Sequence, residues 1–536
     1  MASDSLLLPA EEAEALSGVS DFRGRPVYRS TSGGWRSALF VAAVEIAGSF
    51  AFFGVSANLI TYLTGPLRQS NASAAAAVNA WSGAACMLPL LGAFLADSFL
   101  GRYPSILLAC TLYVLGYGML TVASSLPALH PSPVCADAAE DRDTAAACLP
   151  PLAQVAFLYV SLYLIAFAQG FDKPCGLAFG ADQFDADHPK ESASRSSLFN
   201  WWYFSMAVGI SVAIAVVSYV QENVSWGVGF GVLFAIMFCA FAVYLLGTPT
   251  YRLYAPSPSA GNPLARLARS IAALRLKDDK GSEARGVLRL LPIWATCLAY
   301  GVAYAQITTL FNKQGRTLDR RIGDGGLELP PAVLQTFGPV TILVFVPIYD
   351  RAVVPALRRV TGNPRGLTTL QRTGAGMALS LAAVTMAAAV EGRRLETVRE
   401  QRPAMRWTWL VPQYVAMGVA DVLAVVGMQE FFHGEMPEGL RSLGLALYYS
   451  VMGIGGFISS ALISVLDGLT RRDGSEGWFA DDLNRGHLDY FYWLLAGVSA
   501  GELTLFLCFA RSYAYRNKAP LHQLLVVPTN TANHHA

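Results

Sequence analysis

Residues 161–185, SLYLIAFAQGFDKPCGLAFGADQFD, are apolar enough to cross a bilayer, yet they place a lysine, Lys173, deep within the stretch. An ammonium group at membrane depth costs roughly 2.5 to 3.5 kcal/mol on insertion scales, so it is expected to face an internal cavity and to meet a partner there. A buried intramembrane charge of this kind is typical of proteins that move solutes. We therefore interpret the chain as a candidate carrier.

The composition of the whole chain supports a membrane protein. Of its 536 residues, 54% are hydrophobic and only 14% are charged, which is unusual for a soluble protein. A hydrocarbon core of about 30 Å needs roughly 20 apolar residues per helix, and segments this long without strict alternation are helices. The fold is therefore predicted to be all-α and polytopic. Twelve spans are expected, at 37–63, 74–98, 104–126, 152–178, 199–220, 226–247, 287–311, 332–349, 369–390, 407–431, 442–466 and 488–510.

Basic residues indicate the orientation of these spans. With the N-terminus in the cytosol, 24 lysines and arginines lie inside, 14 lie outside and Lys173 lies within the membrane, which accounts for all 39. The bias predicts that both termini are cytosolic, although the outer loop 391–406 carries five arginines. The polar segment 1–34 does not have the pattern of a signal peptide, so the first helix is expected to direct insertion.

The longest inner loop divides the spans into two groups of six. We expect a cytosolic tail, a first six-helix bundle, a cytosolic linker, a second six-helix bundle and a second cytosolic tail. Their predicted bounds are 1–36, 37–247, 248–286, 287–511 and 512–536.

The two halves share a pattern that suggests parallel repeats of the major facilitator type. After the second span, GAFLADSFLGR (92–102) contains Asp97 and Arg102, and after the eighth span PIYDR (347–351) contains Asp350 and Arg351. An acid and a nearby arginine at an inner helix end can form charge-assisted contacts that break when a gate opens. We therefore predict gating roles for these four residues, with simple anchoring of the helix ends as the alternative.

Six sequence blocks resemble one family: GAFLADSFLGRY (92–103), KPCGLAFGADQFD (173–185), FNWWYFS (199–205), LLPIWATC (290–297), PIYDR (347–351) and QEFFHGEMPEGLRSLG (429–444). In this order they resemble the plant nitrate and peptide transporters, a branch of the proton-dependent oligopeptide transporters within the major facilitator superfamily. The resemblance implies two six-helix bundles and secondary transport of nitrate, peptides or specialised metabolites by alternating access. It also implies a monomer in the plasma membrane or the vacuolar membrane, with protons as a possible second substrate.

The first helix departs from the family pattern. The family has Glu-x-x-Glu followed by Arg or Lys, whereas this chain reads Glu45-Ile-Ala-Gly48-Ser49. In the family these groups are thought to form a protonatable cluster with the lysine of the fourth helix. Here the cluster is reduced to Glu45 and Lys173, and a fixed pair of opposite charges titrates poorly. We therefore predict weakened or lost proton coupling, with retained coupling through Glu45, Asp172 or Glu430 and a non-transporting sensor as the alternatives.

Further residues are candidates for the central cavity by the same resemblance. It maps Glu430 onto a tenth-helix acid that faces the lysine, with a helix-end charge near the cytosol as the alternative. Asp172 is expected to play a structural role, because it lies about 100° around the helix from Lys173. In the seventh helix Tyr304 and Gln306 are candidates, and Tyr304 matches a position where a nitrate-carrying member has a histidine.

Two phenylalanines and two cysteines leave questions open. Phe52 and Phe53 stand where the family has tyrosines. Ordinary packing is the preferred explanation, and a less polar cavity that suits larger, partly apolar solutes is the alternative. Cys135 and Cys148 share an outer loop, and whether they pair depends on how oxidising that face is.

Other classes of protein find little support in the sequence. The chain has no phosphate-binding loop of the Walker type and no histidine spacing suited to a metal. It also has no arrangement of a nucleophile with a base. We therefore expect no enzyme activity, no cofactor, no metal and no nucleic-acid partner.

Overall fold

The computed structural model describes residues 15–125, 151–185, 188–254, 282–323, 327–362, 366–436, 441–471 and 477–513. Cys135, Cys148 and most of the predicted linker lie outside the described residues. In the described part, eleven helices are long and apolar enough to cross a membrane, or twelve if a bent pair counts as one span. The prediction of an all-α polytopic fold is confirmed.

The helices follow the predicted spans closely and are mostly longer at their ends. Their bounds are α2 (Gly34–Ser56), α3 (Leu59–Thr64), α4 (Asn71–Leu95), α5 (Arg102–Ser125), α7 (Leu152–Asp182), α8 (Pro189–Val212), α9 (Ser218–Asn223), α10 (Trp226–Gly247), α12 (Ser282–Thr296), α13 (Leu298–Tyr304), α14 (Leu310–Arg316), α15 (Phe337–Ile348), α16 (Val354–Thr361), α17 (Thr369–Arg399), α18 (Val411–Glu435), α19 (Arg441–Thr470) and α20 (Leu488–Ser512). Two short strands precede α2, at β1 (Ala15–Ser20) and β2 (Pro26–Tyr28), and three lie between helices, at β3 (Leu253–Tyr254), β4 (Arg321–Ile322) and β5 (Leu327–Glu328).

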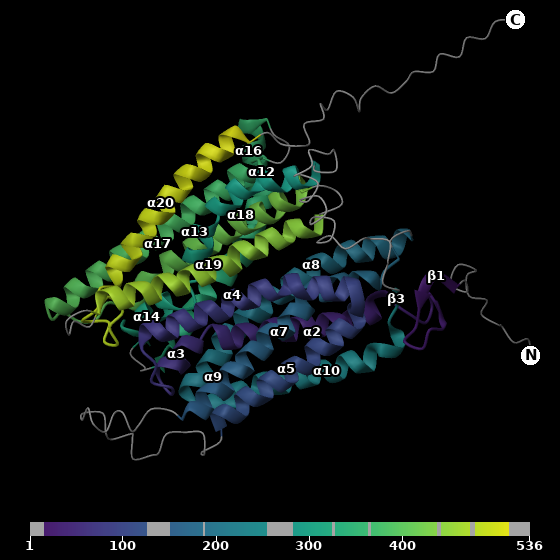
Figure 1. The fold of residues 1–536 in the computed structure, drawn as a ribbon, viewed down its shortest axis with the longest axis horizontal. Coiled ribbons are helices and arrows are strands. Elements are labelled where there is room, and N and C mark those ends of the chain that lie inside the picture. The colour runs from purple at the N-terminus through teal and green to yellow at the C-terminus, as the bar shows by residue number, and fades with distance from the viewer. Residues whose placement is uncertain are drawn as a thin grey trace, which may run out of the picture.

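The helices form two bundles that follow the order of the chain. In the first bundle α7 packs on α4 and α5, and α10 packs on α2 and α5; in the second, α17 packs on α18 and α20. Contacts of α4 with α19 and of α8 with α15 join the two bundles. In Figure 1 the purple-to-teal bundle lies beneath the green-to-yellow one. This is the two-bundle arrangement of the major facilitator fold.

Two local features interrupt the regular helices at related places. The π-helical turns Ala96–Leu100 and Tyr349–Val353 each follow the end of a span and contain Asp97 and Asp350, respectively.

The seventh span bends by 41° between α12 and α13, and there the backbone N–H of Ala299 donates a 2.8 Å hydrogen bond to Glu502. A helix break in lipid is tolerated when another side chain satisfies the freed backbone group, as Glu502 does here.

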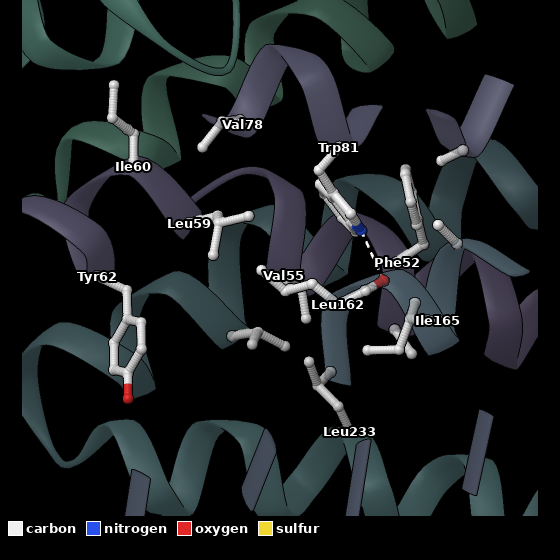
Figure 2. Close-up of a cluster of buried hydrophobic side chains, with 14 of the residues drawn as sticks. Phe52, Val55, Leu59, Ile60, Tyr62, Val78, Trp81, Leu162, Ile165 and Leu233 are labelled. Atoms are coloured by element: carbon white, nitrogen blue, oxygen red, sulfur yellow. Dashed lines mark hydrogen bonds between the residues drawn. The ribbon is translucent and has the colours of Figure 1, made fainter. Parts of the chain in front are cut away.

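A cluster of buried hydrophobic side chains joins helices of the first bundle (Figure 2). Phe52 of α2 stacks on Trp81 of α4, with their ring centroids 5.0 Å apart, and the Trp81 indole N–H donates a 2.7 Å hydrogen bond to the Leu162 carbonyl of α7. Both rings are buried. Packing therefore accounts for Phe52, as the sequence analysis preferred, and these contacts fix α2, α4 and α7 against one another.

A buried arginine ties together several segments at the end of the molecule that carries β1, β2 and β3, opposite α3 and α14 (Figure 1). Arg252 is 1% exposed and donates to Glu191 at 2.7 Å and to the Ser32 carbonyl at 2.9 Å. Gly33 leaves space for it, because a Cβ there would lie 2.1 Å from the guanidinium Nε. Burial acts to raise the pKa of Glu191, but hydrogen bonds from Arg252 and from the Asp185 backbone outweigh it and leave that pKa below its usual value.

The second end of the molecule holds the two bundles in contact. The Ala57 carbonyl, at the break between α2 and α3, accepts hydrogen bonds from Asn312 at 2.8 Å and from Gln335 at 2.7 Å. Close by, Lys313 donates to Thr64, and Asn71 donates to the Ala480 carbonyl at 2.8 Å. The bundles are therefore sealed together at the end that carries α3 and α14.

Within the first bundle, α4 and α7 approach so closely that only glycine fits between them. A Cβ placed on Gly92 would lie 1.8 Å from the carbonyl oxygen of Gly170, which is backbone and has no rotamer with which to move aside. Small residues at such crossings let membrane helices pack by van der Waals contact. The GAFLAD block thus contains a packing requirement as well as an acid.

We expect Gly92→Ala to destabilise the protein by about 1–3 kcal/mol or more, because overpacking forces the two backbones apart. Gly392→Ala is the matched control, since Gly392 also lies inside a helix but a Cβ there would meet nothing within 4 Å. The control should be neutral or up to about 1 kcal/mol more stable. Thermal unfolding in detergent measures both, and an unchanged midpoint for Gly92→Ala would contradict the close crossing.

We expect Glu191→Gln to lower the thermal midpoint at neutral pH, since it removes the charge that Arg252 meets. A carboxyl whose pKa is lowered by folding stabilises the protein above its unfolded pKa of about 4.5, and this contribution is lost as the pH falls through the folded value. The difference between wild type and variant should therefore shrink at acid pH. If the difference in thermal midpoint between wild type and Glu191→Gln stays constant down to about pH 3, Glu191 does not have the lowered pKa described above.

Candidate functional site

The lysine at membrane depth meets two groups of the first helix. Lys173 lies in α7, and its ammonium donates to the Ser49 hydroxyl at 2.9 Å and to the Glu45 carboxylate at 3.4 Å. The Lys173 side chain is 20% exposed, whereas that of Glu45 is only 4% exposed. The structure therefore brings together the acid and the base that the sequence analysis paired, with Ser49 standing where the family has a cation.

A second acid joins this group, although the sequence analysis expected it to point elsewhere. Asp172 is fully buried, and it accepts a 3.3 Å hydrogen bond from the Tyr113 hydroxyl of α5. Its carboxyl also lies within interaction range of both Glu45 and Lys173. Neighbouring positions on a helix diverge by about 100°, but α2 lies against α7 so that Glu45 reaches both side chains. The expectation that Asp172 stands apart from this cluster is wrong.

Two glycines make the close arrangement of these acids feasible. A Cβ on Gly176 of α7 would lie 2.0 Å from the Glu45 carboxyl oxygen, so Glu45 rests directly on the α7 backbone. A Cβ on Gly48 of α2 would lie 3.1 Å from a carboxyl oxygen of Asp172. The space next to Gly48, where the family places its second glutamate, is therefore taken by a carboxyl that comes from α7.

The second bundle holds a buried acid of its own. Asp421 lies midway along α18 and accepts a hydrogen bond from the Tyr300 hydroxyl of α13. Tyr304 lies one turn further along α13, with its ring 6.4 Å from that of Tyr300. Tyr448 of α19 interacts electrostatically with both Tyr304 and Asp421. Asp421 is thus surrounded by phenol groups.

Tyrosines also connect this acid with the lysine of the first bundle. Tyr449 interacts electrostatically with Lys173, and its ring lies 5.1 Å from that of Tyr448. The two oppositely charged groups are therefore linked by an aromatic path that crosses from one bundle to the other.

Comparison with known proteins establishes the family. A family model described as the POT family matches residues 103–278 and 266–479. The chain belongs to the POT family. The protein NRT1/PTR FAMILY 5.10 of Arabidopsis thaliana is 45% identical over 542 residues, covering 92% of this chain and 95% of the relative. NRT1/PTR FAMILY 5.15 of the same plant is 43% identical, covering 95% and 99%. The expected resemblance to plant nitrate and peptide transporters is confirmed.

Solved structures of POT transporters share the fold. An auto-inhibited POT family peptide transporter superimposes with a TM-score of 0.71 at 20% identity, covering 90% of this chain and 98% of the other. A POT family transporter in complex with 5-aminolevulinic acid superimposes with a TM-score of 0.66 at 14% identity, covering 90% and 98%. At such identities the likeness shows the fold alone.

The structure places Glu430 at a helix end, which was the alternative in the sequence analysis of this POT chain, and it places Gln306 at a contact between the bundles. Glu430 is near the end of α18 with its side chain 42% exposed and 4.0 Å from Arg372, so it is not the buried acid of this helix. Gln306 is fully buried and donates to Ser459 at 2.8 Å, and Ser459 also accepts from Asn79 of α4 at 2.9 Å. Gln306 therefore supports a contact between the bundles.

Of the two predicted gating pairs, only Asp350 with Arg351 can be followed among the described side chains. Arg102 forms an ion pair with Asp182 at the end of α7, and the side chain of Asp97 is outside the described part. Asp350 and Arg351 are both exposed in a π-helical turn, and we find no ion pair between them. Gating by these four residues stays a prediction.

Sequence reasoning missed Asp421, although a signal for it exists. The span VPQYVAMGVADVLAVVGMQEFF (411–432) contains one acid in its middle, and an ionisable residue at that depth is a functional candidate by default.

We expect Tyr300→Phe to destabilise the protein by about 1–3 kcal/mol, because the buried Asp421 carboxyl would lose its donor. Tyr414→Phe is a matched control on α18, since the buried Tyr414 hydroxyl has no hydrogen-bond partner among the described residues. Thermal unfolding should separate the two variants. Equal thermal midpoints for Tyr300→Phe and Tyr414→Phe would show that the hydrogen bond from Tyr300 to Asp421 does not stabilise the protein.

Proposed function

We propose that this POT family member carries a small solute with an anionic group across the membrane by alternating access, and that Lys173 binds the anion. The single observation that carries the proposal is the partly exposed side chain of Lys173 within the membrane-spanning helix α7. An ammonium has three hydrogens to donate, and two of its partners are Ser49 and Glu45. The third hydrogen remains for an anionic oxygen of a solute.

The second bundle suggests that the solute also bears a positive or hydrogen-bonding group. Asp421 is an acid of the second bundle, and Tyr448 and Tyr449 link it with Lys173. A zwitterion with its carboxylate at Lys173 would place its amine toward Asp421. Relatives are named as NRT1/PTR family members and peptide transporters, which fits this class. Nitrate, peptides and specialised metabolites remain the candidate substrates, and the protein moves its solute without converting it.

The contacts between the bundles support one stage of a transport cycle. Hydrogen bonds from Asn312 and Gln335 to Ala57 seal the end that carries α3 and α14. We propose that this end faces outward and that both termini are cytosolic, as the basic residues predict. The structure then corresponds to a carrier closed toward the outside, acting as a monomer in the plasma membrane or the vacuolar membrane.

The proposal also concerns coupling to protons. The sequence analysis predicted weakened or lost coupling on the premise that Glu45 has Lys173 as its sole charged neighbour. Asp172 changes this premise, since two acids now surround one base. We therefore favour the alternative, a carrier that still moves protons together with its solute.

We expect Lys173→Ala to lower the apparent affinity for the solute by about 10- to 100-fold, because a hydrogen bond to a charged group contributes roughly 1.5–3 kcal/mol. Uptake and efflux in oocytes, with nitrate, dipeptides and a metabolite mixture at external pH 5.5 and 7.5, measure the effect. Arg359→Ala is the control, since Arg359 is an exposed cation on α16.

The outcomes of this experiment separate the possible functions. Flux that is unchanged in Lys173→Ala would overturn the anion site. Binding without flux in the wild type would favour a sensor. Flux that is equal at both pH values and runs down either gradient would restore the uncoupled carrier that the sequence analysis preferred.

A further inference from the structure

The acids next to Lys173 each keep one oxygen without a partner. Oε1 of Glu45 and Oδ1 of Asp172 are buried, and neither has a hydrogen-bond partner among the described residues. The Glu45 side chain is 4% exposed and Asp172 is fully buried. Buried acceptors are rarely left without a hydrogen bond. These two oxygens would therefore be expected to accept one, yet no described side chain donates to either of them.

The charges around the pair do not balance when both acids are ionised. Two carboxylates then face one ammonium, Lys173, and no second cation stands among the described groups that interact most strongly with the two acids or with Lys173. The other titratable groups that interact with the cluster are neutral near pH 7; they are Cys110, Tyr113 and Tyr117 of α5 and Tyr449 of α19. One uncompensated negative charge would therefore remain in a medium of low dielectric constant, at a high energetic cost.

We propose that Glu45 and Asp172 share one bound proton and form the proton site of this carrier, with Asp172 supplying from α7 the carboxyl that α2 lacks at Gly48. A single proton between the two carboxyls gives each unpaired oxygen a hydrogen-bond partner and brings the cluster to neutrality with Lys173. The Tyr113 hydroxyl, which donates to the other oxygen of Asp172 at 3.3 Å, orients that carboxyl toward Glu45.

The position of the site explains how the proton and the solute would be linked. Without the proton, two negative charges hold the Lys173 ammonium, so a solute anion competes poorly for it. With the proton bound, one negative charge remains and the ammonium becomes available to the solute. Binding of the proton and binding of the anion then favour each other to the same extent, as linkage requires. This inference rests on the proposed carrier function, but the protonation itself can be measured without any transport.

Infrared difference spectroscopy of the purified protein in lipid nanodiscs tests the site directly. A protonated carboxyl has a C=O stretch that an ionised carboxylate lacks. We expect this band in the wild type at pH 7.5, and we expect both Glu45→Gln and Asp172→Asn to remove it, because the remaining acid pairs with Lys173 as an ion. Glu400→Gln, at an exposed acid on the surface, should leave it unchanged, and Asp421→Asn identifies any band from the second bundle.

A double variant tests the proposal even if the single variants fold poorly. Gly48→Asp combined with Asp172→Gly moves the carboxyl from α7 back to α2, into the same space, and should restore the band that Asp172→Gly alone abolishes. A band that survives Asp172→Asn, or is absent from the wild type, would overturn the shared proton. Failure of the carrier function would appear differently, as a normal band in a protein without flux.

Discussion

A charge inside a membrane protein must be balanced nearby, because hydrocarbon and packed side chains solvate it poorly. The Lys173 ammonium imposes this requirement on the first bundle. Glu45 meets it from α2, and Glu45 can lie against α7 because Gly176 has no side chain. The stacked Phe52 and Trp81 rings then hold α2 against α4 two turns away. These packing contacts therefore hold the Lys173 ammonium close to the acids that balance its charge.

The two bundles hold opposite charges in different ways. The first holds a base with two acids, whereas the second holds one acid, Asp421, within a group of tyrosines. They are joined by side-chain amides that donate to backbone carbonyls, as Asn312 and Gln335 do at Ala57. Such neutral contacts cost little to break compared with buried ion pairs. A carrier that alternates between two arrangements benefits from strong electrostatics within each bundle and modest hydrogen bonds between them.

The site was predictable in part, and the reasons for the failures are geometric. Pairing Glu45 with Lys173 followed from the need to neutralise a buried charge. Asp172 was set aside because adjacent helical positions diverge, yet the helix crossing lets Glu45 approach both residues. Glu430 was chosen by resemblance and Asp421 was not considered; the two lie nine residues apart, which is about 13 Å along a helix. That distance takes Glu430 from the bundle interior to its end, beside Arg372.

The amino-acid sequence was enough to predict a polytopic helical protein, and eleven or twelve spans are found among the described residues, because an apolar segment of that length satisfies its backbone in lipid by forming a helix. It also identified Lys173, since a lone charge in such a segment is visible without coordinates. Only the tertiary structure decided which acids surround that lysine and where the bundles touch. Those relations depend on how closely helices approach, and at Gly48, Gly92 and Gly176 the approach is set by the absence of a side chain opposite a group that is distant in sequence.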